Sequence, residues 1–206
     1  MSKLVIGIDE SYTRTGITVL IDKELYSMQS IYFTGCKCNT DKRKAIRKTL
    51  YEILDDIRMN CNADEIKCII ERIRTFSGGH MSAQYLITTG GLITTIIDVM
   101  HQYNVPVYSV DTKSWKNNII GDSKPLNNPY GINPNKYPTI LYLKQNGLLK
   151  YIAEPYKGRG EKGVIKVKID GKRVPCKIND DLADSYCIAM YGFLPKTKQK
   201  LKEEKF

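Results

Sequence analysis

Four acidic residues stand where secondary-structure elements are expected to begin or end. Asp9 and Glu71 each close a short apolar run, and Asp181 and Asp184 lie on one face at the start of a predicted helix. Carboxylates that converge repel one another unless their pKa values rise or a divalent cation binds between them. Oxygen-only ligands favour magnesium or manganese, and two such ions suit attack of water on a phosphodiester.

The same acids also allow a simpler interpretation. The chain has 22 aspartates and glutamates, so two of them can fall at strand ends by chance. Asp180 and Asp181 can cap the positive end of a helix, where aspartate is a favoured residue. Their spacing alone therefore leaves both a metal site and ordinary element termini open.

The elements that would hold these acids alternate between strands and helices, which favours an α/β fold with a mixed sheet. Short adjacent strands near the N-terminus predict an antiparallel meander. Asp170-Gly171 between two alternating runs predicts a hairpin with a primed turn. Strands are expected at 3–9, 16–21, 25–34, 66–71, 105–110 and in the hairpin 164–178, and helices at 41–59, 82–103, 112–120, 140–149 and 180–194.

Size and charge fit one domain at residues 1–194, followed by a charged tail at 195–206 that we expect to fray. The net charge of +10 favours an anionic partner, either nucleic acid or a membrane surface. No apolar run is long enough for a membrane span or a signal peptide, and the six scattered cysteines suit a reducing compartment. We therefore expect a cytoplasmic protein with no membrane partner.

Four motifs resemble, in the same order, those of the RuvC family of Holliday junction resolvases. They are VIGIDESYTRTG, CIIER, PVYSVDTKSWKNNIIG and DDLADSYCIAMYG. The resemblance implies an RNase H-like fold, in which helices flank a mixed central sheet. It also implies a magnesium-dependent endonuclease, with manganese as a substitute and two ions per active site, that resolves four-way junctions or other branched DNA such as forks by paired nicks.

The resemblance also implies roles for single residues. Lys116 matches a lysine that the family places near the scissile phosphate, although it could equally be a solvated helix lysine. Lys124 could match a second such lysine, and Lys113 is expected to contact DNA. Asp180 falls outside the Asp-x-x-Asp register. The acids that match the family's metal ligands are Asp9, Glu71, Asp181 and Asp184.

The sequence departs from the bacterial RuvC proteins shortly after the second acid. Those proteins carry an aromatic residue there that stacks on an unpaired base. Here Phe76 is the nearest aromatic residue, and Arg74 stands at the expected offset. Both are candidate DNA contacts, while base wedging and sequence preference stay open, because Phe76 could also belong to the core.

A second departure is the longer segment before the last motif, which we interpret as a basic loop and hairpin inserted at about 125–178. Residues 150–177 hold nine Lys/Arg and three acids, a net charge of +6. We expect this hairpin to grip phosphates; alternatively, its lysines only solvate a sheet edge. The insertion favours a phage or viral branch of the family, and hence the cytoplasm of a host cell. The expected contacts are Lys166, Lys168, Lys172 and Arg173.

Two other functions stay open at this point. An actin-like sugar kinase or ATPase would also carry Gly-Ile-Asp and Thr-Gly, as part of its first phosphate-binding loop. Those folds need a second lobe, for which 206 residues are too few. A catalytically silent relative that binds branched nucleic acid is the other alternative, and the retention of all four acids argues against it.

A homodimer is expected for junction resolution, because two matched nicks require two sites related by two-fold symmetry. The helix at 82–103 is the segment expected to form the interface, both from its small and apolar residues and from the family resemblance. Gly90 and Gly91 would allow a partner helix to approach closely, although much of the apolar set must be intramolecular core.

Overall fold

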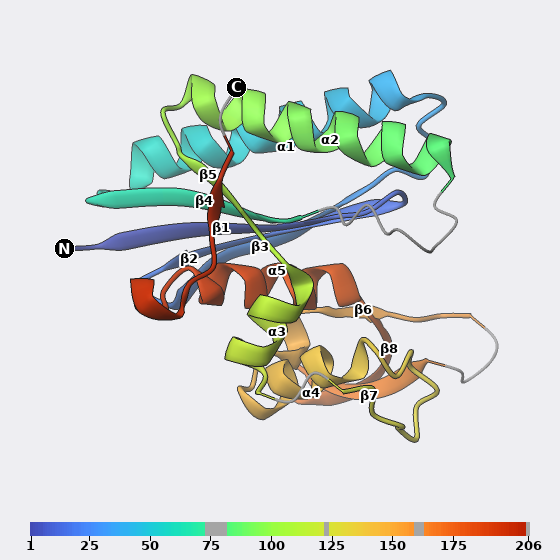
Figure 1. The fold of residues 1–206 in the computed structure, drawn as a ribbon. Coiled ribbons are helices and arrows are strands. Elements are labelled where there is room, and N and C mark those ends of the chain that lie inside the picture. The colour runs from blue at the N-terminus through green and yellow to red at the C-terminus, as the bar shows by residue number, and fades with distance from the viewer. Residues whose placement is uncertain (73–81, 122–123, 159–162, 205–206) are drawn as a thin grey trace.

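A six-stranded mixed sheet forms the middle layer of the molecule (Figure 1). The computed structural model describes residues 1–72, 82–121, 124–158 and 163–204. In this sheet β1, β2 and β3 form the predicted antiparallel meander, while β4 runs parallel to β1 and β5 parallel to β4. The order is β3-β2-β1-β4-β5-β9, with β1 Lys3–Glu10, β2 Arg14–Ile21, β3 Glu24–Tyr32, β4 Glu65–Glu71, β5 Val107–Val110 and β9 Lys202–Glu203.

Helices cover both faces of this sheet, which is why its central strands read as continuous apolar runs (Figure 1). Side chains alternate along β1, so that Leu4, Ile6 and Ile8 pack under α1 and α2, whereas Val5 packs against α5. The predicted α/β class with a mixed sheet is confirmed. The three helices are α1 Asn39–Asn60, α2 Ala83–Gln102 and α5 Asp180–Tyr191.

The apolar helix α2 lies in the core. No apolar run in the sequence was expected to be long enough for a membrane span, but by length and composition α2 passes as one. Its Leu92, Ile96 and Met100 are fully buried in the cluster between the sheet and α1. The side chain of Ser82 caps the helix by accepting a hydrogen bond from the N–H of Tyr85 at 3.1 Å. Packing in the core therefore accounts for the apolar residues on one face of α2, while Ile87 on the other face is exposed.

The segment between β5 and α5 builds a small three-stranded sheet below α5 in the view of Figure 1. The predicted hairpin is present, with Asp170 and Gly171 at φ values of 48° and 81°, as a primed turn requires. A third strand pairs with it and was not predicted, because three residues carry no periodicity. The elements are α3 Thr112–Ile119, α4 Tyr137–Gln145, a 3-10 turn Leu149–Tyr151, β6 Ala153–Pro155, β7 Val164–Ile169 and β8 Lys172–Ile178.

Helix α4 begins and ends earlier than the predicted range 140–149. Pro138 lies in its first turn, where a missing N–H costs no helical hydrogen bond. Gly147, with a φ of 72°, follows the last residues and takes the chain out of the helix. The apolar residues at 148–149 that suggested a longer helix belong to the turn that follows.

The C-terminal tail is anchored where the structure describes it, in contrast to the expected fraying. Ser109 and Tyr108 of β5 pair with Lys202 and Glu203 of β9. Upstream, the side-chain amide of Gln199 donates to carbonyls at the end of α5. The free edge of β5 offers unpaired backbone groups, and the tail satisfies them.

Two glycines bring α5 into direct contact with the backbone of the sheet. A Cβ at Gly7 in β1 would overlap the carbonyl of Ser185, and one at Gly16 in β2 would overlap the carbonyl of Asp181. Gly16 is also the register partner of Asp9. The absence of two side chains thus sets the height of α5 above β1 and β2.

Candidate active site

The four predicted acids face the same side of the sheet, and we call them the acid cluster. Asp9 and Glu71 end β1 and β4, parallel neighbours whose last paired residues are Ile8 and Ile70. Both acids point toward α5, whose first two turns carry Asp181 and Asp184. Asp9 is 8% exposed and Asp184 is 2% exposed. The structure therefore brings the four predicted carboxylates together at one end of the sheet.

Burial makes the acid cluster electrostatically costly. Burial raises the pKa of Asp9 well above its usual value, and the charges of Asp184, Glu71 and Asp181 raise it further. The pKa of Asp181 is also raised, first by burial and then by Asp180, while Arg14 opposes the change. Such a site favours either protons or cations among its carboxylates.

Glu71 is held in place by two side chains of α3. The hydroxyl of Thr112 donates to one carboxylate oxygen, and the indole N–H of Trp115 donates to the other at 2.9 Å. Trp115 is fully buried, so its ring is fixed by packing. Burial raises the pKa of Glu71, and these two hydrogen bonds act against it. The carboxylate is thus oriented before any ligand binds.

Two cations that the sequence did not reveal lie against the acid cluster. Arg14, the first residue of β2, forms ion pairs with Asp180 and Asp181. Lys136, next to the start of α4, lies with its ammonium nitrogen 2.7 Å from Asp184 and 3.6 Å from Asp180. Asp180, which falls outside the family register, therefore lies between both cations.

The charge of Lys136 is secured by the same acids. Burial acts to lower its pKa, but the charges of Asp184 and Asp9 outweigh burial and raise the pKa above its usual value. Its ammonium group therefore stays protonated and offsets part of the negative charge of the acid cluster.

Two solved structures share this arrangement of elements over nearly the whole chain. RuvC of Thermus thermophilus in complex with a Holliday junction substrate aligns with a TM-score of 0.55 and 14% sequence identity, covering 91% of this chain and 90% of that chain. A second Thermus thermophilus RuvC structure aligns with a TM-score of 0.53 and 16% identity, covering 91% of each chain. The chain has the RuvC fold. No protein-family model and no curated protein matches it by sequence.

The RuvC fold confirms what the four motifs implied about architecture. The expected RNase H-like sheet, with helices on both faces, is the one observed. A phage or viral origin is not addressed by these comparisons and stays a prediction.

Of the predicted lysines, Lys116 lies beside Trp115, a residue that orients Glu71. The ammonium group of Lys116 donates to the carbonyl of Asn135 at 3.3 Å and lies 5.1 Å from the ring centroid of Trp115. Lys113 and Lys124 are exposed. In the described ranges no carboxylate pairs with Lys116, so its role near the scissile phosphate stays a prediction. Arg74 and Phe76 lie outside the described residues.

The basic hairpin presents most of its cations on one face, which we call the basic face. Lys168 pairs with Arg173 across the strands, and Lys166 lies two positions before Lys168 on the same side. All three are exposed, as is Lys177, which was not among the predicted contacts. Lys172 is exposed too, but it pairs with Ile169 on the opposite side, beside the turn.

A buried asparagine ties this small sheet to the acid cluster. Asn179 caps α5, and its side-chain oxygen accepts the N–H of Leu182 at 3.1 Å. Its amide nitrogen donates to Glu154 of β6 at 2.7 Å and to Ser30 of β3 at 2.7 Å. The helix that carries two of the acids is therefore anchored to both sheets.

The acid cluster has the oxygen ligands that magnesium prefers, but its carboxylates are spread apart. Asp184 Oδ1 is buried and has no hydrogen-bond partner among the described residues, so this oxygen is available as a metal ligand. Within those residues, no three carboxylate, histidine or cysteine groups lie close enough to share one metal ion. The donor set fits a divalent cation, provided that the side chains rearrange around Arg14 and Lys136.

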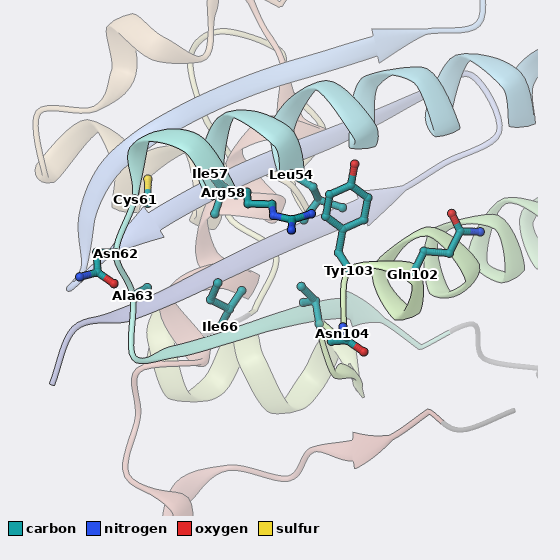
Figure 2. A pocket seen from close by; sticks show the side chains of 11 residues that line it. Leu54, Ile57, Arg58, Cys61, Asn62, Ala63, Ile66, Gln102, Tyr103 and Asn104 are labelled. Atoms are coloured by element: carbon teal, nitrogen blue, oxygen red, sulfur yellow. The ribbon is translucent and has the colours of Figure 1, made fainter.

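A separate cavity of about 380 Å³ lies at the other end of the strands (Figure 2). Leu54 and Arg58 of α1, Ile66 at the start of β4 and Tyr103 after α2 line it. Because the acids end β1 and β4 whereas Ile66 begins β4, this cavity is not part of the acid cluster.

Proposed function

We propose that the chain is a metal-dependent, structure-selective DNA endonuclease that resolves Holliday junctions or other branched DNA by paired nicks. The observation that carries this proposal is the buried acid cluster at one end of a RuvC fold. The similar Thermus protein was solved in complex with a Holliday junction substrate, which supports branched DNA as the ligand of this chain as well.

We infer that the acid cluster holds Mg²⁺, or Mn²⁺ in its place, with two ions per active site. When bound, the ions would activate water and offset charge on the phosphate. The chain's own residues prepare the site: Thr112 and Trp115 orient Glu71, and burial makes the carboxylate of Asp9 costly to ionise unless a cation binds. Once ions neutralise the acids, Arg14 and Lys136 become available to bind phosphate oxygens.

The alternative of a catalytically silent, branched-DNA-binding relative has one observation in its favour. Arg14 and Lys136 already neutralise part of the acid cluster without an ion. An actin-like ATPase fragment is disfavoured, because the RuvC fold accounts for about nine-tenths of the chain.

Cleavage of a four-way junction separates these possibilities. With millimolar magnesium, the chain is expected to nick two strands of like polarity in the junction and to leave a linear duplex of the same sequence intact. A chelator should stop the nicks and preserve binding, because affinity comes mainly from basic residues. Binding without nicks in any divalent cation would favour the silent relative. The absence of both binding and nicks would refute the proposal.

We also propose that the chain acts as a homodimer through α2, with one correction to the predicted interface. Ile87 is 60% exposed. A Cβ at Gly90 would meet nothing within 4 Å, so a partner helix can approach there. Gly91 is covered by the side chain of Arg43, so it is not open to a partner.

Sedimentation equilibrium at micromolar concentration is expected to give the mass of two chains. Ile87→Glu should give the mass of one chain, because it buries an unpaired charge in the proposed interface. Met59→Glu is the matched control on α1, where Met59 is 77% exposed, and it should leave the dimer intact. A one-chain mass for the wild type, with and without junction DNA, would rule out the dimer.

We place the protein in the cytoplasm, of a host cell if a phage encodes it. All six cysteines are free, which suits a reducing compartment.

A further inference from the structure

A groove of about 450 Å³ runs between α1 and α2, on the outer side of the helical layer. Each helix contributes residues at positions i, i+3, i+4 and i+7, the spacing of a single helix face. We call it the basic groove; it is lined by Thr40, Arg43, Lys44, Arg47, Gly91, Thr94, Thr95 and Asp98.

The basic groove holds more positive charge than the protein neutralises. Arg43, Lys44 and Arg47 are exposed, and Asp98 is the one acid in its lining. Among the described residues no carboxylate forms an ion pair with any of these three cations. On the same helix, by contrast, Lys48 pairs with Glu52 at 3.9 Å. The groove is therefore ready to accept an anion.

The absence of a side chain at Gly91 makes room for the guanidinium of Arg43 in the basic groove. A Cβ at Gly91 would lie 2.7 Å from one terminal guanidinium nitrogen of Arg43 and 2.9 Å from Nε. Glycine is unfavourable inside a helix, and the close approach of the guanidinium gives a physical reason for it here. The neighbouring Gly90 has no such contact, since its Cβ would meet nothing within 4 Å.

The basic groove begins at the end of the molecule that carries the acid cluster. Helix α1 follows β3, whose last residue Tyr32 pairs with Arg14 at that end, and α2 follows β4, which ends at Glu71. Both helices therefore point their positive N-termini toward this end (Figure 1). The small sheet with the basic face lies on the opposite side of the central sheet (Figure 1).

We propose that the basic groove binds the phosphate backbone of a DNA arm that leaves the acid cluster on the side away from the small sheet. The inference rests on the proposed function, since it takes branched DNA as the ligand. Arg43 and Arg47 are about 6 Å apart along the helix axis. One strand of duplex DNA carries a phosphate about every 3.4 Å of its axis, so the pair spans about two phosphates. Such contacts position an arm without reading its sequence.

The salt dependence of junction binding tests the basic groove. In Arg43→Ala/Arg47→Ala the slope of log affinity against log salt should become shallower by about two, one unit for each lost phosphate contact. The matched control is Lys48→Ala/Arg58→Ala, which removes two exposed cations from the same helix outside the groove. Its slope should stay within about half a unit of wild type.

A second variant displaces Arg43 without a change of charge. Gly91→Ala places a methyl group where the guanidinium lies, so the slope should fall by about one while thermal unfolding stays unimpaired, since alanine favours the helix. Met59→Ala, at an exposed position of α1 outside the groove, is its control and should keep the wild-type slope; sedimentation of each variant identifies any change in dimerisation.

The outcomes distinguish the inference from the proposed function. If wild type binds junctions while the groove variants keep its slope, the basic groove is not a DNA contact, although the nuclease proposal stands. If wild type does not bind junctions at all, both fail together.

Discussion

Asp9→Asn is expected to abolish nicking of junction DNA and to leave the affinity for the junction within about twofold. Asp9 lies at the centre of the acid cluster, where it interacts with Asp184, Glu71 and Asp181. Removal of one member of a catalytic unit costs about three orders of magnitude or more in rate. Binding depends on basic residues instead and should persist. Single-turnover nicking and a gel-based binding assay measure the two quantities on the same samples.

The stability of the same variant provides an independent check. A folded-state pKa above the usual value means that ionised Asp9 disfavours folding at neutral pH, since the unfolded carboxyl ionises more readily. Asparagine removes this cost, so the thermal midpoint at pH 7 should stay equal or rise. Glu52→Gln, an exposed acid on α1, should change neither rate nor midpoint. Wild-type nicking by Asp9→Asn would overturn the assignment of the acid cluster.

Replacement of the hairpin cations Lys166, Lys168, Lys172 and Arg173 by alanine is expected to weaken junction binding with a shallower salt dependence. Three of the four share the basic face, so the slope of log affinity against log salt should fall by about three. Lys172 lies on the opposite side of the hairpin and should add little. At saturating DNA the nicking rate should stay near wild type, because none of these residues touches the acid cluster.

The matched control removes three exposed cations that lie far from the basic face. Lys48→Ala/Arg58→Ala/Lys198→Ala takes two charges from α1 and one from the turn after α5, and its slope should stay near wild type. If the hairpin variant behaves like this control, its lysines only solvate a sheet edge, as the alternative interpretation holds.

The acids could be predicted because each is fixed by a local pattern. An apolar run that ends on an acid places Asp9 and Glu71 at strand ends, and parallel neighbours end at the same edge. The spacing of Asp181 and Asp184 puts both on one helix face. Local pattern and spatial arrangement agree here, so no knowledge of loops was needed.

Arg14 and Lys136 could not be found in this way. Arg14 meets acids far along the chain, and its one local signal is its place in the turn after Asp9. Lys136 reaches Asp184 only because the chain after α3 folds back before α4 begins. The short strands β6 and β9 were missed for a related reason, since their pairing partners and not their own residues decide them.

The contact of α5 with Gly7 and Gly16 limits how the active site can adjust. The helix backbone rests directly on two strands, so it cannot sink or slide without a backbone clash. Asp181 and Asp184 therefore move as one body with Asp9. Any tightening of Asp9, Asp181 and Asp184 around a ligand therefore has to come from rotation of their side chains and not from movement of α5 against β1 and β2. Positions 7 and 16 thus constrain the reaction geometry although neither has a side chain.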